Sequence, residues 1–314
     1  MKKFLKFVII FISFSTLFYL VALILCALIL PSGLTKNIQY HIGGTGQMNS
    51  RIKDIQNFKN CDIVFLGSSH AYRSFDTRIF SQQHIQSFNL GSSSQTPIQT
   101  EILLDKYLDY LNPKTIVYEV YPLTFTEDGV ESALDLIAND HIDLNTFKMV
   151  LNLNHTKVYN TFLYGYFRQF FSLNDAFSEP RNINDDTYID GGFVERKLTY
   201  YNQDSVYKSK MLEFNKNQIL SFERTIIKLK QRGVKIILVQ APVSHNLYNS
   251  VLNNSAIDSY YLSKTPNYFN FNKLINLNDH QYFFDADHLN QNGVQFFNTS
   301  LINLLKQKEL IITK

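Results

Sequence analysis

The sequence has no tryptophan, few prolines and only two cysteines, Cys26 and Cys61. The two cysteines lie in different kinds of segment, and they lack the short spacing that zinc ligands need. These scarcities argue against a disulfide framework and against a cysteine zinc site.

Neither sign of charge dominates the sequence. The formal net charge is +3, and no run of lysine or arginine is long enough to follow a phosphate backbone. Nucleic acid is therefore not an expected partner. The chain is 45% hydrophobic and holds 26 Phe and 19 Tyr, which excludes an intrinsically disordered protein. Its 314 residues can bury a large core in one domain or in two smaller ones.

One long apolar run stands at the N-terminus. Residues 7–30 carry no charged side chain, and three lysines precede them. A helix over this run would be roughly 36 Å long, enough to cross a hydrocarbon core of about 30 Å. The lysines keep the N-terminus in the cytoplasm by the positive-inside rule. A cleaved signal peptide is the competing interpretation, but its apolar region would be shorter and no small-x-small cleavage site precedes Pro31.

We therefore expect residues 1–31 to be a cytoplasmic tip and a single-pass anchor in the cytoplasmic membrane. Residues 32–60 are polar and form a connector. Residues 61–314 should form a domain on the extracytoplasmic side, in a periplasmic or extracellular location. Within it, residues 123–210 are a long connection rich in Tyr, Phe and Asn, which predicts a lid or an inserted subdomain.

The hydrophobic pattern of this domain alternates between strands and helices. Short apolar runs that end at turn-forming or polar residues predict buried strands at residues 62–66, 85–90, 115–120 and 234–239. Amphipathic helices are predicted at residues 97–111, 219–229 and 294–304. This alternation predicts an α/β fold with a parallel sheet, whose functional site lies at the carboxyl ends of the strands.

The first predicted strand ends in Gly67-Ser68-Ser69-His70. A serine on a tight turn between a strand and a helix projects its hydroxyl above the sheet, and Gly67 permits the turn. Ser69 is therefore a candidate nucleophile. The simpler alternative is that these serines only cap a helix.

The second candidate motif is Asp285-Ala286-Asp287-His288, just before the last predicted helix. A serine nucleophile needs a base, and the base needs a carboxylate that orients it. Asp285 can fold back onto one ring nitrogen of His288, while the adjacent Asp287 is expected to point away. Two alternatives remain: the aspartates cap the last helix, or Asp285, Asp287 and His288 bind a metal ion.

Together the two motifs resemble the SGNH/GDSL hydrolase superfamily. Ser69 matches its block I serine, Asn89-Leu90-Gly91 its block II, and Asp285 and His288 its block V. The resemblance covers about residues 62–305 and leaves the insertion unmatched. It implies a flavodoxin-like three-layer α/β/α fold, a serine nucleophile, and the amide of Gly91 in the oxyanion hole. No metal or organic cofactor is expected.

One block of that family is missing. Where the family has Gly-x-Asn-Asp after the third strand, this chain has Glu119-Val120-Tyr121-Pro122, so Tyr121 stands in place of the oxyanion asparagine. Losing such a donor typically costs about 3 kcal/mol of transition-state stabilisation. The Ser69 amide, Ser93, Ser94 or the Tyr121 hydroxyl could replace it.

Other polar residues lie at the same strand ends. His70 could contact substrate, although an exposed histidine in a first helical turn is the simpler interpretation. Glu119 could hold the site loops or bind substrate, and Arg73 could pair with it. His245, after the fourth predicted strand, could line the cleft.

The resemblance to membrane-anchored branches of the family, which are polysaccharide O-acetyltransferase-like and D-alanyl-transfer-like, implies an esterase or an O-acyltransferase that modifies envelope glycans. Its partners would be an acyl donor, an envelope polysaccharide or another acyl ester, and the lipid bilayer. One alternative is a non-catalytic accessory protein that binds glycan or docks a membrane acyltransferase partner. Another is a metal-dependent hydrolase.

Overall fold

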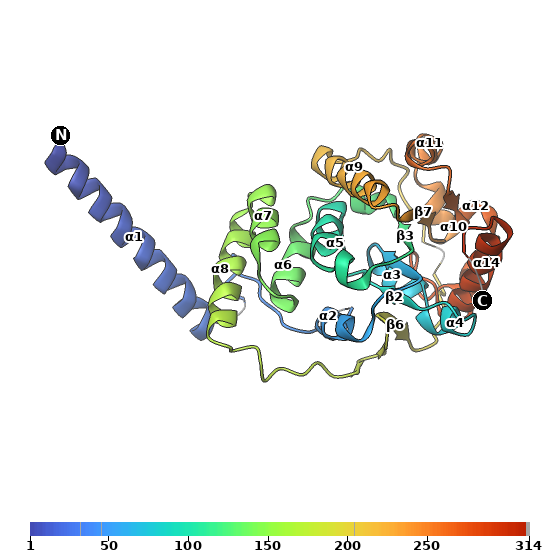
Figure 1. Cartoon of the computed structure of the whole chain (residues 1–314), viewed down its shortest axis with the longest axis horizontal. Helices are drawn as coiled ribbons and strands as arrows, with labels where there is room; N and C mark the ends of the chain where they lie inside the picture. The colour runs from blue at the N-terminus through green and yellow to red at the C-terminus, as the bar shows by residue number, and fades with distance from the viewer. Residues whose placement is uncertain (32, 45, 204, 312–314) are drawn as a thin grey trace. The chain divides into compact units, whose positions relative to one another are not determined.

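The computed structural model describes residues 1–31, 33–44, 46–203 and 205–311 (Figure 1). The chain divides into two compact units. One unit combines Met1–Ile42 with Ala133–Ser178, and the other combines Gly43–Ser132 with Glu179–Lys314. The long connection predicted at residues 123–210 is thus divided between the units, and each unit is described by itself.

The larger unit is built on a parallel sheet of five strands in the order β2-β1-β3-β7-β8. The strands are β1 (Ile63–Leu66), β2 (Ser87–Asn89), β3 (Thr115–Glu119), β7 (Lys235–Gln240) and β8 (Tyr268–Asn270). The α/β prediction is confirmed, and the strand order is that of flavodoxin-like sheets. β8 was not predicted, because Asn267 and Asn270 flank Tyr268 and Phe269 and leave no longer apolar run.

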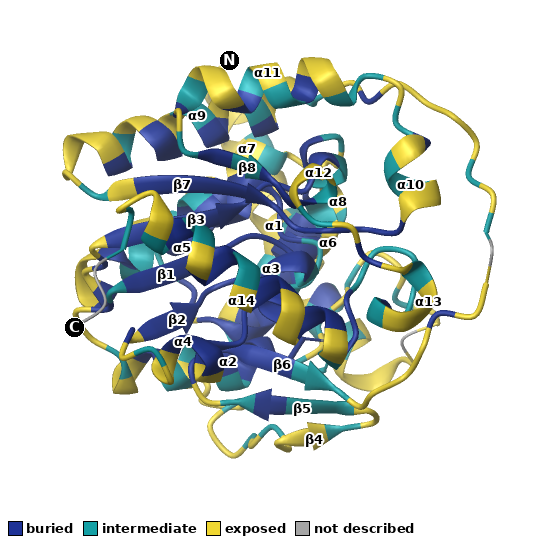
Figure 2. Cartoon of the chain, turned by 90° about the vertical axis from the view of Figure 1, so that its right-hand side faces the viewer, coloured by how far each residue is buried: buried dark blue, intermediate teal, exposed yellow. Residues whose placement is uncertain are grey.

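Helices cover both faces of this sheet (Figure 2). α5 (Pro97–Leu111) packs against α9 (Lys216–Gln231) on one face. α5 begins where a capping box of Thr96 and Gln99 satisfies its first amides, with Pro97 at the first helical position. Arg224 of α9 pairs with Glu101 of α5 at 2.6 Å. Further along the same two helices, Lys228 pairs with Asp105 and Arg232 with Asp109.

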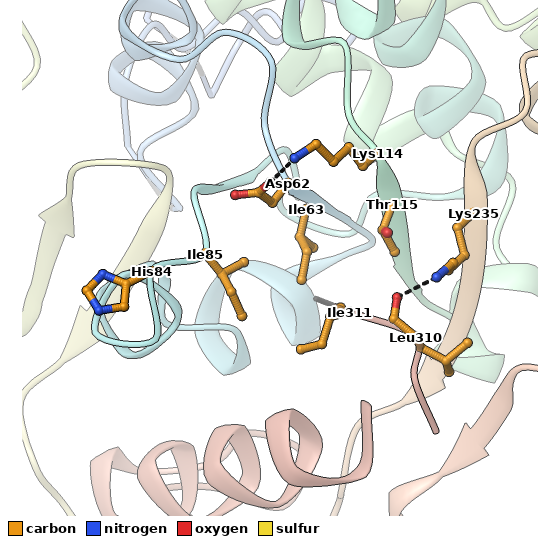
Figure 3. Close-up of a pocket in the computed structure, with 9 residues that line it drawn as sticks. All are labelled: Asp62, Ile63, His84, Ile85, Lys114, Thr115, Lys235, Leu310 and Ile311. Atoms are coloured by element: carbon orange, nitrogen blue, oxygen red, sulfur yellow. Dashed lines mark hydrogen bonds and ion pairs between the residues drawn. The ribbon is translucent and has the colours of Figure 1, made fainter. Parts of the chain in front are cut away.

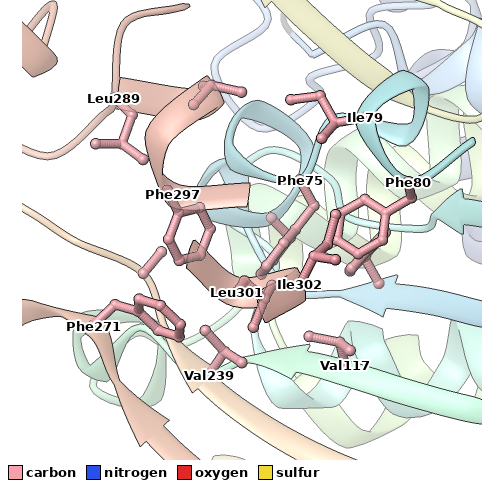
Figure 4. Close-up of a cluster of buried hydrophobic side chains, with 14 of the residues drawn as sticks. Phe75, Ile79, Phe80, Val117, Val239, Phe271, Leu289, Phe297, Leu301 and Ile302 are labelled. Carbon is pink, nitrogen blue, oxygen red and sulfur yellow. The ribbon is translucent and has the colours of Figure 1, made fainter. Parts of the chain in front are cut away.

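The opposite face carries α3 (Ser69–Ser74), α4 (Thr77–Ser81) and α14 (Gln291–Gln307). Their apolar side chains meet the sheet in the main hydrophobic core (Figure 4). Phe297 and Leu301 of α14 lie over Val117 and Val239 of the strands, and all four side chains are fully buried. Burial of such side chains stabilises the fold by ~2 kcal/mol each. This packing holds α3 in a fixed position over β1.

Several shorter elements complete the larger unit. They are α2 (Met48–Asp54), η1 (Ile55–Asn57), η2 (Pro122–Phe125), α10 (His245–Asn249), α11 (Asn254–Lys264), α12 (Phe271–Leu274) and α13 (Asp279–Tyr282). A small antiparallel sheet is formed by β4 (Asn182–Ile183), β5 (Asp186–Ile189) and β6 (Phe193–Arg196). Arg73 of α3 donates two hydrogen bonds to Asp186 of β5, at 3.0 and 2.7 Å. The small sheet is therefore fastened to the helix that begins with Ser69.

The smaller unit is helical. It contains α1 (Lys2–Ile29), most of α6 (Val130–Asn139), α7 (Leu144–Leu153) and α8 (Thr156–Phe170). Of the described helices, α1 alone is long and apolar enough to cross a membrane or to act as a signal sequence. α1 contacts α8, where the hydroxyl of Tyr19 donates a hydrogen bond of 2.5 Å to Asn160.

Candidate active site

The site lies where the chain changes direction in the sheet. From β1 the chain passes to β2 on one side, and it then returns to β3 on the other side of β1. Loops that leave β1 and β3 therefore diverge and leave a crevice at their carboxyl ends. Ser69 begins α3 shortly after the end of β1, and Tyr121 follows the end of β3.

Local sequence fixes the position of Ser69. Gly67 has φ 136°, and a β-carbon there would lie 2.9 Å from atoms of Glu119. Only glycine fits this turn without strain. Ser68 is the N-cap of α3, and its hydroxyl accepts a hydrogen bond from the amide of His70 at 3.3 Å. The capping task thus belongs to Ser68, and the side chain of Ser69 reaches toward His288.

Ser69 and His288 lie side by side although they are far apart in the sequence. Nε2 of His288 is 2.8 Å from the hydroxyl oxygen of Ser69. Nδ1 of the same ring is 3.0 and 3.1 Å from the two carboxylate oxygens of Asp285. Asp285 also accepts the amides of Asp287 and His288, at 3.0 and 2.8 Å. These two hydrogen bonds hold the turn in which the ring meets the carboxylate.

A residue next to His288 is expected to point away from it. Asp287 instead points toward the ring. One of its carboxylate oxygens lies 3.1 Å from Nδ1 of His288. The tight turn at residues 285–288 brings both aspartates to the same nitrogen. Asp287 also lines the cavity beside Ser69.

The two carboxylates control the charge of the base. Burial alone would lower the pKa of His288, but hydrogen bonds and charge attraction from Asp285 and Asp287 outweigh it and raise the pKa to about 9. Burial would raise the pKa of Asp287, but His288 holds it well below its ordinary value. An imidazolium beside two carboxylates is therefore the favoured state at neutral pH.

Aromatic rings flank His288. The Phe284 ring is nearly parallel to it at 7°, with centroids 5.4 Å apart. The His70 ring lies 4.9 Å away at 25°, and Tyr121 lies 3.8 Å from His70. His70 is only 2% exposed, so the interpretation as an exposed first-turn histidine was wrong. Burial lowers the pKa of His70 to about 3 and keeps this ring neutral.

Of the residues expected at the oxyanion hole, some are hydrogen-bonded within the protein and others line the cavity beside Ser69. The amide of Gly91, expected to bind the oxyanion, donates to the Asn89 side chain at 3.1 Å. Asn89 in turn donates to the Ala71 carbonyl at 2.8 Å, which secures α3. Ser94, rather than Ser93, lines the cavity beside Ser69, with φ 49°. Tyr121 lines it as well.

Glu119 lies beneath the site and is almost fully buried. It accepts the amide of Ala241 at 3.4 Å and so links the end of β3 to the end of β7. Burial raises its pKa to about 8, so the carboxyl group is protonated at neutral pH. Arg73 does not pair with it, because Arg73 is bound to Asp186.

His245 stands apart from the other candidates. It is exposed at the start of α10 and lies 2.8 Å from Asp279. It is not among the described residues that line the cavity beside Ser69. The expectation that it lines the cleft therefore finds no support in its position.

The cavity beside Ser69 has a volume of about 270 Å³. Its lining includes Ser132 in the first turn of α6 and the acidic residues Glu127, Asp128 and Glu131. Sequence reasoning missed these four residues, because no motif marks them and they lie in the connection after β3. Only their position after that strand could have pointed to the site.

The positions of the side chains show how well this site suits a metal ion. His70, Asp287 and His288 offer ligand atoms that lie within 4.8 Å of one another. The two imidazole rings, however, are stacked with 25° between their planes, so their in-plane lone pairs run side by side rather than converge. Nδ1 of His288 already faces Asp285 and Asp287, and Nε2 faces Ser69. The arrangement fits proton transfer better than metal coordination.

A second cavity, of about 250 Å³, lies at the opposite ends of the strands (Figure 3). Lys114 at its edge pairs with Asp62 at 2.6 Å. Lys235 donates to the carbonyl of Leu310 at 2.8 Å. Both cations are thus engaged by the protein itself, and the candidate active site remains the cavity beside Ser69.

No family model matches this chain, and no curated protein matches it. Sixteen chains of solved structures match it, including the following three. One from Bacteroides fragilis, provisionally described as an acylhydrolase, is 9% identical with a TM-score of 0.41, over 84% of this chain and 98% of that one. One from Streptococcus pneumonia, provisionally described as a platelet activating factor, is 12% identical with a TM-score of 0.42, over 82% and 94%. A gut microbial diltiazem-metabolizing enzyme is 14% identical with a TM-score of 0.27, over 78% and 47%.

Proposed function

We propose that this protein is a serine acyl-ester enzyme, with Ser69 as nucleophile, His288 as general base and Asp285 as the carboxylate that orients the base. The observation that carries the proposal is the unbroken series of contacts from Ser69 through His288 to Asp285, at 2.8 and 3.0 Å. These are the distances at which a proton can pass from a hydroxyl to an oriented imidazole.

The reaction follows from these positions. Nε2 of unprotonated His288 takes the proton of Ser69, and the serine oxygen bonds to the carbonyl carbon of the ester. The bond to the leaving alcohol then breaks, and His288 returns the proton to the alcohol oxygen. The amides of Ser69 and Ser94 are the donors we propose for the oxyanion, since Gly91 is engaged by Asn89.

The acyl-enzyme then reacts with a second nucleophile. His288 takes the proton of water in an esterase, or of a sugar hydroxyl in an O-acyltransferase. The acceptor oxygen bonds to the acyl carbon, the bond to the Ser69 oxygen breaks, and His288 returns the proton to that oxygen. The two activities differ in which acceptor reaches the acyl group and in how well water is kept out. We propose envelope glycans as substrates and acetyl as the acyl group, because α1 would hold the catalytic domain at the outer face of the cytoplasmic membrane. This part rests on the resemblance in sequence.

A fluorophosphonate that reacts with activated serines tests the assignment. The full chain in detergent should be labelled, and Ser69→Ala should not be. Ser81→Ala is the matched control, because it removes an exposed serine hydroxyl outside the cavity lining and should keep labelling. Equal labelling of wild type and Ser69→Ala would overturn the nucleophile.

A further inference from the structure

Three residues that line the cavity beside Ser69 each carry a buried polar atom that has no hydrogen-bond partner within the described part of the chain. The atoms are Nε2 of His70, the hydroxyl of Tyr121 and the hydroxyl of Ser132. All three side chains are more than nine-tenths buried. A buried polar group without a partner is costly, so such groups in a cavity wall indicate a site that a polar ligand or water completes.

The charged side chains among the described lining residues are all acidic, while the His288 imidazolium lies behind Ser69. Glu127, Asp128 and Glu131 are exposed at its mouth, and Asp287 lines it near His288. No lysine or arginine is among the described residues that line it. His70, the one basic side chain there, is neutral because burial lowers its pKa to about 3. The cavity therefore disfavours an anionic ligand.

The cavity offers little to a long acyl chain. Leu123 is the one aliphatic side chain larger than alanine among the described lining residues. Binding of an acyl chain depends on apolar area removed from water, whereas a sugar needs hydroxyl and imidazole partners. The unpartnered atoms of His70, Tyr121 and Ser132 supply such partners.

We infer that this cavity binds the alcohol part of the ester, and that this alcohol is an uncharged or amine-bearing sugar rather than an anionic one. The inference deepens the proposed function and rests on it. The hydroxyls of Tyr121 and Ser132 bind the sugar, and the acidic rim of Glu127, Asp128 and Glu131 excludes carboxylate- and phosphate-bearing sugars.

The test uses three esters of similar size that differ in charge: the 3-O-acetyl methyl glycosides of glucose, glucosamine and glucuronic acid. For the full chain at low salt, we expect kcat/KM for the glucuronate to be about tenfold below that for glucose, and for glucosamine to be at least equal to glucose. Salt near 0.5 M should shrink these differences, because it screens exposed charges over a few ångströms.

Variants assign the effect to the rim. The triple variant Glu127→Gln, Asp128→Asn, Glu131→Gln should bring the three substrates to within about twofold of one another. The matched control Glu213→Gln, Glu309→Gln, Asp175→Asn changes net charge equally at exposed residues outside the cavity lining, and it should keep the selectivity. Equal use of the anionic ester by wild type, or selectivity that survives the rim variant, would overturn the inference.

Binding of the three sugars to Ser69→Ala, measured by calorimetry, separates failure of the proposed function from failure of the inference. If wild type hydrolyses none of the esters and Ser69 is not labelled, the proposed function fails. The order of affinities of Ser69→Ala for the three sugars still decides the inference. An anionic sugar bound as tightly as glucose would contradict it.

Discussion

At the scale of single residues, the main feature is one imidazole that faces two carboxylates. Asp285 and Asp287 both reach Nδ1 of His288, and they raise its pKa to about 9. A general base acts in its unprotonated form, so the raised pKa suppresses the activity at neutral pH. This property follows from the turn at residues 285–288 rather than from any single side chain.

The pH dependence of the reaction checks this description. We expect kcat/KM to fall about tenfold for each pH unit below about 9. Asp287→Asn removes one attraction and should move the midpoint toward the ordinary histidine value. Asp285→Asn should also move it, and kcat should fall by less than the ~10⁴-fold typical of a lone orienting carboxylate, because Asp287 still contacts Nδ1. A wild-type midpoint near 6.5 would contradict the paired carboxylates.

Glu119 carries a second pH effect, on stability. Its folded pKa of about 8 lies above the ordinary value of 4.5, so the unfolded chain releases this proton first as the pH rises. The group therefore lowers the free energy of unfolding between about pH 5 and pH 8. Glu119→Gln should flatten the fall in Tm over this range, as measured by calorimetry. An unchanged pH profile would show that Glu119 is already ionised in the folded protein.

At the scale of elements, the sequence predicted the strands and helices that have a clear apolar pattern. Four of the five strands of the parallel sheet and the three long helices of that unit were predicted, because each has a strong apolar pattern over enough residues. β8 was not predicted, because asparagines on both sides of Tyr268 and Phe269 leave no apolar run. The small sheet β4-β5-β6 was also not predicted, since its strands are short and partly exposed, and their pairing depends on contacts with α3.

Ser69, His288 and Asp285 were predicted from their motifs, whereas the cavity beside them was not. Motifs mark residues whose chemistry requires a fixed spacing. Ser132 and Glu127 belong to no motif, and their place in the site depends on how the segment after β3 folds back. The burial of His70 between Tyr121 and His288 likewise depends on three separate segments.

The contact of Arg73 with Asp186 ties the small sheet to α3. Both side chains are mostly buried, and the hydrogen bonds are bidentate. Removing one partner leaves a buried charge, so Asp186→Asn should destabilise the larger unit by about 3–5 kcal/mol. Urea unfolding measures this loss. Glu195→Gln breaks the more exposed pair with Arg78 and should cost less than about 1 kcal/mol. Equal losses would show that the buried pair has no special role.

At the scale of the whole molecule, the chain combines a sheet that carries the candidate site with a helical unit that contains α1. The anchor was predicted from residues 7–30, and α1 extends over Lys2–Ile29. Its length and composition fit a membrane span or a signal sequence. The division of residues 123–210 between the two units was not predictable, because it depends on which helices pack on α1.

Orientation in the membrane can be tested by labelling. In cells stripped to the cytoplasmic membrane, a maleimide that does not cross membranes should label Lys308→Cys, which is exposed in the larger unit. Lys2→Cys, at the start of α1, should be labelled only after lysis. The reverse pattern would contradict an N-terminus inside the cell.

The central claim is that Ser69 forms a covalent acyl-enzyme with the help of His288. The most direct measurement is the mass of the intact protein after rapid mixing with an activated acetyl ester and an acid quench. We predict a mass increase of one acetyl group, located at Ser69 by peptide mapping and absent from Ser69→Ala. His288→Gln should slow its formation by several orders of magnitude. An acetyl group that forms at the same rate in His288→Gln, or on another residue, would contradict the account.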